Sequence, residues 1–349
     1  MRSATKPSTA TEWVASLSPW PEEFGLDRMR ELLARLDEPQ RAYPAIHVVG
    51  TNGKSTATRT IAELLRAEGL DAGAYTSPHV SGWHERLDCD RETFERAVAR
   101  VRGPAEEEGA TQFEVLTAAA LAEFAEAGVD VAVLEAGLGG RLDATNVVDA
   151  PVVLLTNVAL EHTQVLGETH EQIAKEKLAV AHAARVVVLP DNTFTRLAPI
   201  SADIVIGGPR EAAEAFLARS IQREVEVSLP GRLERRDGEI WDGAHTPEAA
   251  EWLLERLPSR DYVLCVSILA DKRVDELLAR LANAGRTLVA TQSSNPRALP
   301  AGELAERAER HFDHVEALSD PQAALARSRE RGGPVLVTGS LYLLADLYR

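Results

Sequence analysis

This 349-residue sequence lacks the features of secreted, membrane-spanning and nucleic-acid-binding proteins. Its two cysteines, Cys89 and Cys265, lie far apart and outside any metal-binding spacing, which argues against a disulfide framework and favours a reduced, cytoplasmic setting. No apolar run approaches the ~20 residues of a membrane span. Residues 1–11 carry two basic residues without the apolar stretch of a signal peptide. The 54 Asp and Glu residues outnumber the 38 Lys and Arg residues, which argues against a nucleic-acid partner.

The composition that remains is typical of an ordinary globular protein. Hydrophobic residues make up 45% of the chain and charged residues 26%, and the length predicts about two domains with sizeable cores. The net charge of −16 means that an anionic substrate needs a local basic or metal-bearing site, because the surface as a whole repels anions.

Strands and helices alternate along the first two thirds of the chain. A helical pattern covers Glu12 to Leu36, and a short strand then leads into a glycine-containing loop and a second helix. The expected strands are Ile46–Val49, Val129–Leu134, Val152–Leu155 and Val186–Leu189, and the expected helices include Val115–Glu126 and Glu171–Ala184. Such alternation predicts a mostly parallel sheet covered by helices on both faces.

A second alternating series follows Pro230 and Gly231. Its expected strands are Tyr262–Val266, Thr287–Ala290, His314–Ala317 and Val335–Thr338, and its expected helices are Pro247–Arg256, Val274–Asn283, Glu303–His311 and Pro321–Arg329. This series predicts a smaller, doubly wound, Rossmann-like domain. We therefore expect an α/β protein with one domain at residues 1–230 and another at residues 231–349.

The strongest local motif is the loop between the strand that ends at Val49 and the helix that follows it. Gly50 and Gly53 permit a tight turn, backbone N–H groups and the helix N-terminus suit phosphate, and Lys54 supplies a cation. The loop departs from the common Walker pattern, because Val48 stands where that pattern has glycine. A plain Gly-Lys turn before a helix is the alternative interpretation.

Two further side chains lie where parallel strands are expected to end. Glu135 follows the strand Val129–Leu134, and a carboxylate beside a phosphate loop suits Mg²⁺, which prefers oxygen ligands. His162 follows the strand Val152–Leu155 by a short loop. Taken alone, Glu135 is equally consistent with a capped strand end, and a lone histidine is more often structural.

Several segments, in the same order along the chain, resemble the Mur ligase superfamily and in particular its folylpolyglutamate synthase/dihydrofolate synthase branch. They are Gly50–Thr56, Thr76–His79, Glu85–Arg86, Phe113–Thr117, Glu135–Asn146, Glu161–Thr163, Leu166–Gly167, Ile173–Lys177, Pro230–Arg232, Asp242–His245, Asn295–Ala298 and Thr338–Ser340. The order makes this resemblance far more specific than any single motif.

The resemblance implies a role for each matching position. The implied ATP contacts are Asn52, Gly53, Lys54, Ser55, Thr56, Arg232, Asp242 and His245. The implied Mg²⁺ ligands are Ser77, Glu135 and His162, for one or two ions. The implied contacts to a pteroate or folate are Pro78, His79, Thr111, Phe113, Glu114, Leu142, Asp143 and Ala144. Lys177 matches a lysine that carries a carbamate, and Lys54, Lys177 and His162 are the implied catalytic residues.

Residue patterns alone leave some of these roles open. Lys177 is one of two lysines on an amphipathic helix, so solvent exposure is its default interpretation. Phe113 is equally consistent with a core residue, and Asp242 or Thr246 with the N-cap of the helix that follows.

The resemblance implies an ATP-dependent ligase that joins L-glutamate to a pteroate or folate carboxylate through an acyl phosphate. The alternatives are a Mur-type ligase acting on another acid and a nucleotide-binding protein without ligase activity. We expect a monomer, with a dimer as the alternative. The stretch between Lys177 and Gly231 is shorter than in the family, and Asp203–Ile206 and Val225–Leu229 are candidate strands of a pared-down central domain. The sheet edge there must be covered, blunted or paired.

Overall fold

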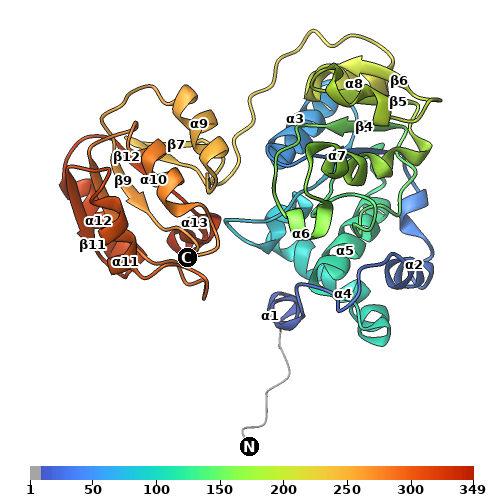
Figure 1. Cartoon of the computed structure of the whole chain (residues 1–349). Helices are drawn as coiled ribbons and strands as arrows, with labels where there is room; N and C mark the ends of the chain where they lie inside the picture. The colour runs from blue at the N-terminus through green and yellow to red at the C-terminus, as the bar shows by residue number, and fades with distance from the viewer. Residues whose placement is uncertain (1–8) are drawn as a thin grey trace, which may run out of the picture. The chain divides into compact units, whose positions relative to one another are not determined.

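The computed structural model describes residues 9–349, which form two compact units. Unit 1 contains residues up to 79 and residues 83–227, and unit 2 contains residues 80–82 and 228–349 (Figure 1). Most of the segment considered above for a signal peptide, residues 1–8, lies outside the described residues. Within residues 9–349, no helix combines the length and apolarity that crossing a bilayer demands.

Unit 1 is built on a six-stranded parallel sheet in the order β2-β3-β1-β4-β5-β6. Its strands are β1 (Ala45–Val49), β2 (Ala72–Tyr75), β3 (Val131–Glu135), β4 (Val152–Leu155), β5 (Val186–Leu189) and β6 (Asp203–Ile206). Every residue of the four strands from β2 to β4 in this order is buried, as expected for a parallel sheet covered on both faces.

Helices cover both faces of this sheet. The helices of unit 1 are α1 (Ala10–Ser16), α2 (Asp27–Ala34), α3 (Lys54–Ala67), α4 (Arg91–Glu108), α5 (Gln112–Ala127), α6 (Thr163–Leu166), α7 (His170–Leu178) and α8 (Pro209–Leu217), with 3-10 turns η1 (Pro39–Arg41), η2 (Trp83–Leu87), η3 (Ala179–Ala183) and η4 (Asn192–Leu197). Side chains alternate between the faces: Val131 and Val133 pack with α3 and α8, whereas Ala132 and Leu134 pack with α4 and α5. The central strand β1 is thereby fixed between two apolar layers.

Unit 2 contains a six-stranded mixed sheet in the order β11-β10-β9-β12-β8-β7. Its strands are β7 (Glu234–Arg236), β8 (Glu239–Trp241), β9 (Val263–Val266), β10 (Thr287–Ala290), β11 (His314–Ala317) and β12 (Val335–Thr338). Its helices are α9 (Pro247–Arg256), α10 (Val274–Leu281), α11 (Ala301–Ala308), α12 (Pro321–Glu330) and α13 (Leu341–Tyr348). Strand β7 runs antiparallel to β8, and the other pairs are parallel. Helices α9, α10 and α11 share one apolar cluster, and α12 and α13 share another.

The expected α/β architecture is therefore confirmed, with two local corrections. The helical pattern over residues 12–36 forms two helices, because Pro19, Pro21 and Gly25 interrupt it between α1 and α2. The candidate strand Val225–Leu229 does not form: the segment joins no sheet, apart from an isolated bridge between Leu229 and Arg232.

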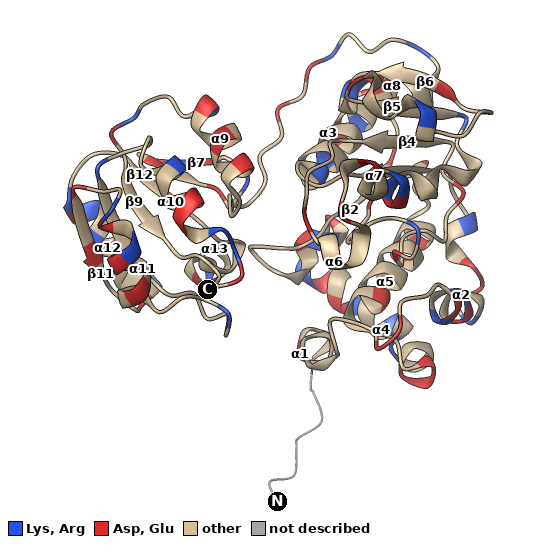
Figure 2. Ribbon diagram, in the orientation of Figure 1, with Lys and Arg blue, Asp and Glu red and all other residues tan. Residues whose placement is uncertain are grey.

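Charged residues lie mainly on the helices and loops of each unit, and strands such as β4 and β9 carry none (Figure 2). The last strand of the first sheet, β6, does form where the candidate strand Asp203–Ile206 was expected. It pairs with β5 on one side, and no strand of the described residues pairs with its other side. Its Ile204 and Ile206 side chains are exposed.

Candidate functional site

The glycine loop after β1 adopts the strand–loop–helix geometry of a phosphate-binding loop. Gly50 has φ +150°, and a Cβ there would lie 1.9 Å from Thr156 Oγ1, so the position requires glycine. Gly53, in the left-handed region at φ +78°, ends the loop, and α3 begins at Lys54. The first N–H groups of α3 have no partner within the helix and therefore suit an anion.

Residues after β4 hold this loop in place. The backbone carbonyl of Asn157 accepts from the Thr51 N–H at 3.1 Å. The side-chain oxygen of Asn157 accepts from the Asn52 N–H at 2.9 Å. Thr156 donates its hydroxyl proton to the Asn52 carbonyl at 2.8 Å. Neither Thr156 nor Asn157 was anticipated from the sequence, because neither belongs to a recognisable motif. Their position at the carboxyl end of a strand adjacent to β1 was the available signal.

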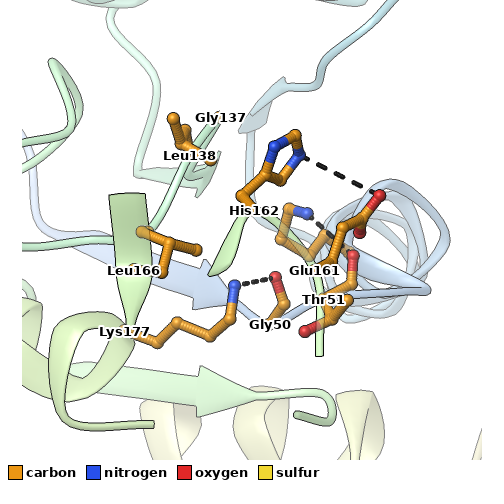
Figure 3. Close-up of a pocket in the computed structure, with 10 residues that line it drawn as sticks. Gly50, Thr51, Gly137, Leu138, Glu161, His162, Leu166 and Lys177 are labelled. Atoms are coloured by element: carbon orange, nitrogen blue, oxygen red, sulfur yellow. Dashed lines mark hydrogen bonds and ion pairs between the residues drawn. The ribbon is translucent and has the colours of Figure 1, made fainter. Parts of the chain in front are cut away.

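Lys54, Lys177 and His162 line one small pocket of about 40 Å³ beside the loop (Figure 3). Its full lining is Gly50, Thr51, Lys54, Gly137, Leu138, Gly139, Glu161, His162, Leu166 and Lys177. The structure thus brings together all three residues expected to be catalytic, from α3, α7 and the segment after β4.

Lys177 is buried, in contrast to the solvent exposure that its helix pattern alone suggests. Its side chain from α7 is directed at the loop, and its amine donates to the Gly50 carbonyl at 2.7 Å (Figure 3). Lys54 donates to the Thr51 carbonyl at 3.2 Å. Burial, and secondarily the charge of Lys54, lowers the pKa of Lys177 to about 7. Burial therefore favours the neutral form of this amine more than in an exposed lysine.

The glycine-rich loop after β3 packs directly on α7. A Cβ at Gly140 would lie 2.5 Å from the Lys177 carbonyl oxygen and 2.8 Å from that of Glu176. The Arg141 N–H donates to the Glu176 carbonyl at 3.0 Å. A Cβ at Gly137 would similarly lie 2.6 Å from the Phe113 ring. Glycine at these positions allows the loop to approach α7 and α5 closely.

The three residues expected to bind metal fall into two groups. Glu135, at the end of β3 and 1% exposed, accepts from the Ser77 N–H at 2.9 Å, and the Ser55 hydroxyl contacts the Ser77 carbonyl at 3.4 Å. His162 lies on the pocket wall, with its Nε2 3.9 Å from Glu161 Oε1 (Figure 3). Within residues 9–349, no three His, Cys, Asp or Glu side chains form a metal-binding cluster. The oxygen-rich pair Ser77 and Glu135 fits Mg²⁺, which commonly binds one or two protein oxygens and fills its shell with waters and phosphate oxygens.

The expected acid-binding residues on α5 are largely engaged with one another. Thr111 and Glu114 form a capping box, in which Glu114 accepts from the Thr111 N–H at 2.8 Å and its hydroxyl at 2.7 Å. Glu114 also accepts from Arg28 Nε at 2.9 Å. Phe113 is partly buried, and its ring centroid lies 6.1 Å from that of Tyr75. The Glu114 carboxylate therefore has a structural role at the start of α5.

The other expected acid-binding residues lie on two loops. Pro78 follows a cis peptide bond. His79 Nδ1 accepts from Arg86 Nε at 3.0 Å, and the His79 ring centroid lies 4.3 Å from that of Trp83, a neighbour that the sequence motifs do not single out. On the glycine-rich loop, the expected positions run from exposed to buried: Leu142 is 38% exposed, Asp143 6% and Ala144 8%.

The expected ATP contacts of unit 2 surround the turn between β8 and α9. Asp242 is buried, which raises its pKa, and its carboxylate accepts from the N–H groups of Leu233 at 2.7 Å and Ala244 at 2.8 Å. His245 Nδ1 donates to the Gly243 carbonyl at 2.8 Å, since a carbonyl oxygen only accepts. The helix cap is Thr246, whose hydroxyl accepts from the Ala249 N–H at 3.2 Å. Arg232 contributes charge that favours the ionised form of Asp242.

Comparison with known proteins assigns both units. The Mur ligase middle domain matches residues 48–229, and the Mur ligase glutamate ligase domain matches residues 231–341. A dihydrofolate synthase/folylpolyglutamate synthase of Mycobacterium tuberculosis is 31% identical over 84% of this chain and 80% of its own length.

Solved structures agree with this assignment. Escherichia coli FolC in complex with DHPP and ADP has a TM-score of 0.83, with 27% identity over 99% of this chain and 98% of that chain. The bifunctional folylpolyglutamate synthase/dihydrofolate synthase of Yersinia pestis complexed with AMPPNP and Mn has a TM-score of 0.84, with 29% identity over the same shares. The chain therefore belongs to the Mur ligase family, among the folylpolyglutamate synthase/dihydrofolate synthase enzymes.

Proposed function

We propose that this protein is an ATP-dependent ligase that joins L-glutamate to the carboxylate of a pteroate or folate. The observation that carries the proposal is the pocket in which Lys54, Lys177 and His162 converge beside the phosphate-binding loop and the glycine-rich loop 137–145. The family membership of both units supports it.

The chemistry requires activation, because a carboxylate would have to expel oxide to form an amide directly. A carboxylate oxygen of the acid attacks the γ-phosphorus of ATP, the bond to the bridging oxygen breaks, and ADP leaves. The amine nitrogen of L-glutamate then attacks the acyl carbon, phosphate leaves, and the nitrogen loses a proton. Both steps depend on positioning and on neutralising converging negative charge.

Lys54 and the N-terminus of α3 supply positive charge at the transferred phosphate. Asn52, Gly53, Ser55 and Thr56 surround the phosphates in this proposal. Mg²⁺, when bound by Ser77, Glu135 and His162, adds neutralisation of the phosphate oxygens. Arg232, Asp242 and His245 are the proposed ATP contacts of unit 2.

Lys177 is the proposed carbamate. The ammonium first loses a proton; the neutral amine then attacks carbon dioxide, forms an N–C bond and releases a second proton, so that a cation becomes an anion. The burial that lowers the pKa of Lys177 to about 7 favours this reaction, because only the neutral amine is nucleophilic. ¹³C-labelled bicarbonate is expected to give a carbamate resonance that Lys177→Ala removes; the same resonance in the variant would exclude Lys177 as its site.

The acid is proposed to contact Pro78, His79, Phe113 and the segment 142–144. Thr111 and Glu114 act there by fixing the start of α5, because their side chains are bound to each other and to Arg28. We further propose that the protein is cytoplasmic and acts as a monomer on small-molecule substrates.

The test is phosphate release from MgATP and L-glutamate with dihydropteroate, with tetrahydrofolate and without an acid. Release that requires both glutamate and a pterin acid is expected, and the preferred acid distinguishes dihydrofolate synthesis from polyglutamate extension. Release with a different acid would assign another Mur-type ligase. ATP binding without release for any acid of a wider panel would assign a nucleotide-binding protein.

A further inference from the structure

The central strand β1 contains a histidine whose imidazole is completely buried. Side chains alternate along β1, so Ile46 and Val48 face α3 while His47 faces the opposite layer. His47 Nε2 lies 2.8 Å from Thr145 Oγ1, and His47 Nδ1 has no hydrogen-bond partner. A buried nitrogen without a hydrogen-bond partner costs free energy. The hydrogen bond of the other ring nitrogen, Nε2, is therefore the interaction that can account for a histidine at this position.

The direction of the protons in this contact follows from the next one. Thr145 Oγ1 lies 2.6 Å from Asp143 Oδ1. Burial raises the pKa of Asp143, but backbone N–H groups donate to both of its oxygens and favour the ionised form. An ionised carboxylate only accepts, so the hydroxyl donates its proton to Asp143. The same hydroxyl must then accept from His47, which therefore carries its proton on Nε2. Burial, with a smaller contribution from His182, lowers the pKa of His47 to about 3, consistent with a neutral ring.

The chain of hydrogen bonds ends on the residue that closes the glycine-rich loop. Asp143 Oδ2 accepts from the Leu138 N–H at 2.7 Å, and its Oδ1 accepts from the Thr145 N–H at 3.0 Å. One carboxylate thus ties the beginning of the segment 137–145 to its end. Gly137, Leu138 and Gly139 of this segment line the pocket.

Strand β1 consequently connects two parts of the site. Three residues after His47 it enters the phosphate-binding loop at Gly50, and through His47 and Thr145 it reaches the loop proposed to contact the acid. We propose that His47 is a positioning residue, which acts through Thr145 and Asp143 to set the loop 137–145 against the phosphate-binding loop. The expected effect on catalysis rests on the proposed function. The hydrogen bonds that join His47, Thr145 and Asp143 do not depend on it.

Thr145→Val removes the hydroxyl at nearly constant volume, and Thr145→Ser is the matched control that keeps it. For Thr145→Val we expect kcat/KM for the acid to fall at least about tenfold, with the KM for ATP within about twofold of wild type. Thr145→Ser stays near wild type. His47→Gln, whose amide can donate where Nε2–H does, retains more activity than His47→Leu. Equal losses in Thr145→Val and Thr145→Ser, or equal effects on acid and ATP, would overturn the proposal.

Two measurements keep the test independent of substrate identity and of the folding of any one variant. In the wild-type protein, ¹⁵N NMR is expected to show the Nε2–H tautomer of His47, with no titration between pH 5 and 8, whereas an Nδ1–H ring would refute the chain of hydrogen bonds. Amide exchange of Leu138 and Thr145 is expected to be at least about tenfold faster in Thr145→Val than in Thr145→Ser, with α8 unchanged. If the wild type fails to turn over any pterin acid while both measurements hold, the proposed function fails and the arrangement of His47 stands.

Discussion

Replacement of Gly140 by alanine is expected to damage both stability and turnover, although it adds only one methyl group. The new Cβ would lie 2.5 Å from the Lys177 carbonyl oxygen and 2.8 Å from the Glu176 carbonyl oxygen. Ordinary contact distances are about 3.5 Å, so the loop or α7 has to move by several tenths of an ångström or more. Both obstructing atoms are backbone, so no side chain can rotate away. The backbone of Gly140 itself is outside the left-handed region, so the effect is purely steric.

Overpacking of this kind typically costs about 1–3 kcal/mol. The displaced helix turn carries Lys177, whose amine contacts the Gly50 carbonyl at 2.7 Å, so the shift is passed to the pocket. A misplacement of about 1 Å in a catalytic group can reduce turnover about a hundredfold. We therefore expect Gly140→Ala to lower the denaturation midpoint and to lose most glutamate-dependent phosphate release.

The matched control is Gly302→Ala on α11, because a Cβ there meets nothing within 4 Å. Alanine at an open helical position is expected to be neutral or to stabilise by up to about 1 kcal/mol. Denaturant unfolding and phosphate release are measured side by side for both variants. If Gly140→Ala behaves like Gly302→Ala in both assays, the close approach of the glycine-rich loop to α7 is not important for this enzyme and the reasoning fails.

The remaining predictions concern charged groups. Lys54→Ala is expected to abolish glutamate-dependent phosphate release, because Lys54 supplies the cationic side chain of the phosphate-binding loop; an unchanged rate would remove it from the mechanism. Lys177→Ala is expected to lose turnover while the fold is kept. Lys175→Ala alters an exposed position of the same helix and is expected to stay near wild type. Wild-type activity of Lys177→Ala would contradict the carbamate role. Glu114→Ala is expected to destabilise unit 1 by about 2 kcal/mol in urea unfolding, because it removes a capping box and a partly buried ion pair. Arg28→Ala, which leaves the capping box intact, should cost less, and the reverse order would contradict this account.

The strands that are short apolar runs between turns could be predicted from the sequence, and several of the other elements could not. Val152–Leu155 and Val186–Leu189 are short apolar runs between turns, and they form β4 and β5 as expected. Strand β2 reads Ala-Gly-Ala-Tyr and lacks the β-branched residues that mark a strand, so pairing with β3 defines it. The segment Val225–Leu229 shows the reverse case, because it has alternating apolar residues but no neighbouring strand with which to pair.

The site could be predicted where a residue belongs to a motif, and not where a tertiary contact defines its role. Order along the chain was sufficient to select Lys54, His162 and Lys177, which line one pocket. The burial of Lys177 could not be inferred from the pattern of α7, since it depends on the phosphate-binding loop more than a hundred residues earlier. Asn157 and His47 were missed for the same reason: their partners are distant in sequence, and neither residue type at that spacing indicates a contact.

The pocket beside the phosphate-binding loop takes none of its lining from the chain that follows Lys177. The alignment with the M. tuberculosis relative extends over 392 positions, more than the 349 residues of this chain, so the relative carries additional residues. Every residue that lines the pocket lies at or before Lys177, in the loop after β1, on α3 or α7, or in the segments that follow β3 and β4. The chain between Lys177 and unit 2 instead forms β5 and β6, at the opposite edge of the sheet from β2, and α8, which packs with α3 and β4. The groups expected to act in phosphoryl transfer, Lys54 and Lys177, therefore come from elements that precede β5 in the chain.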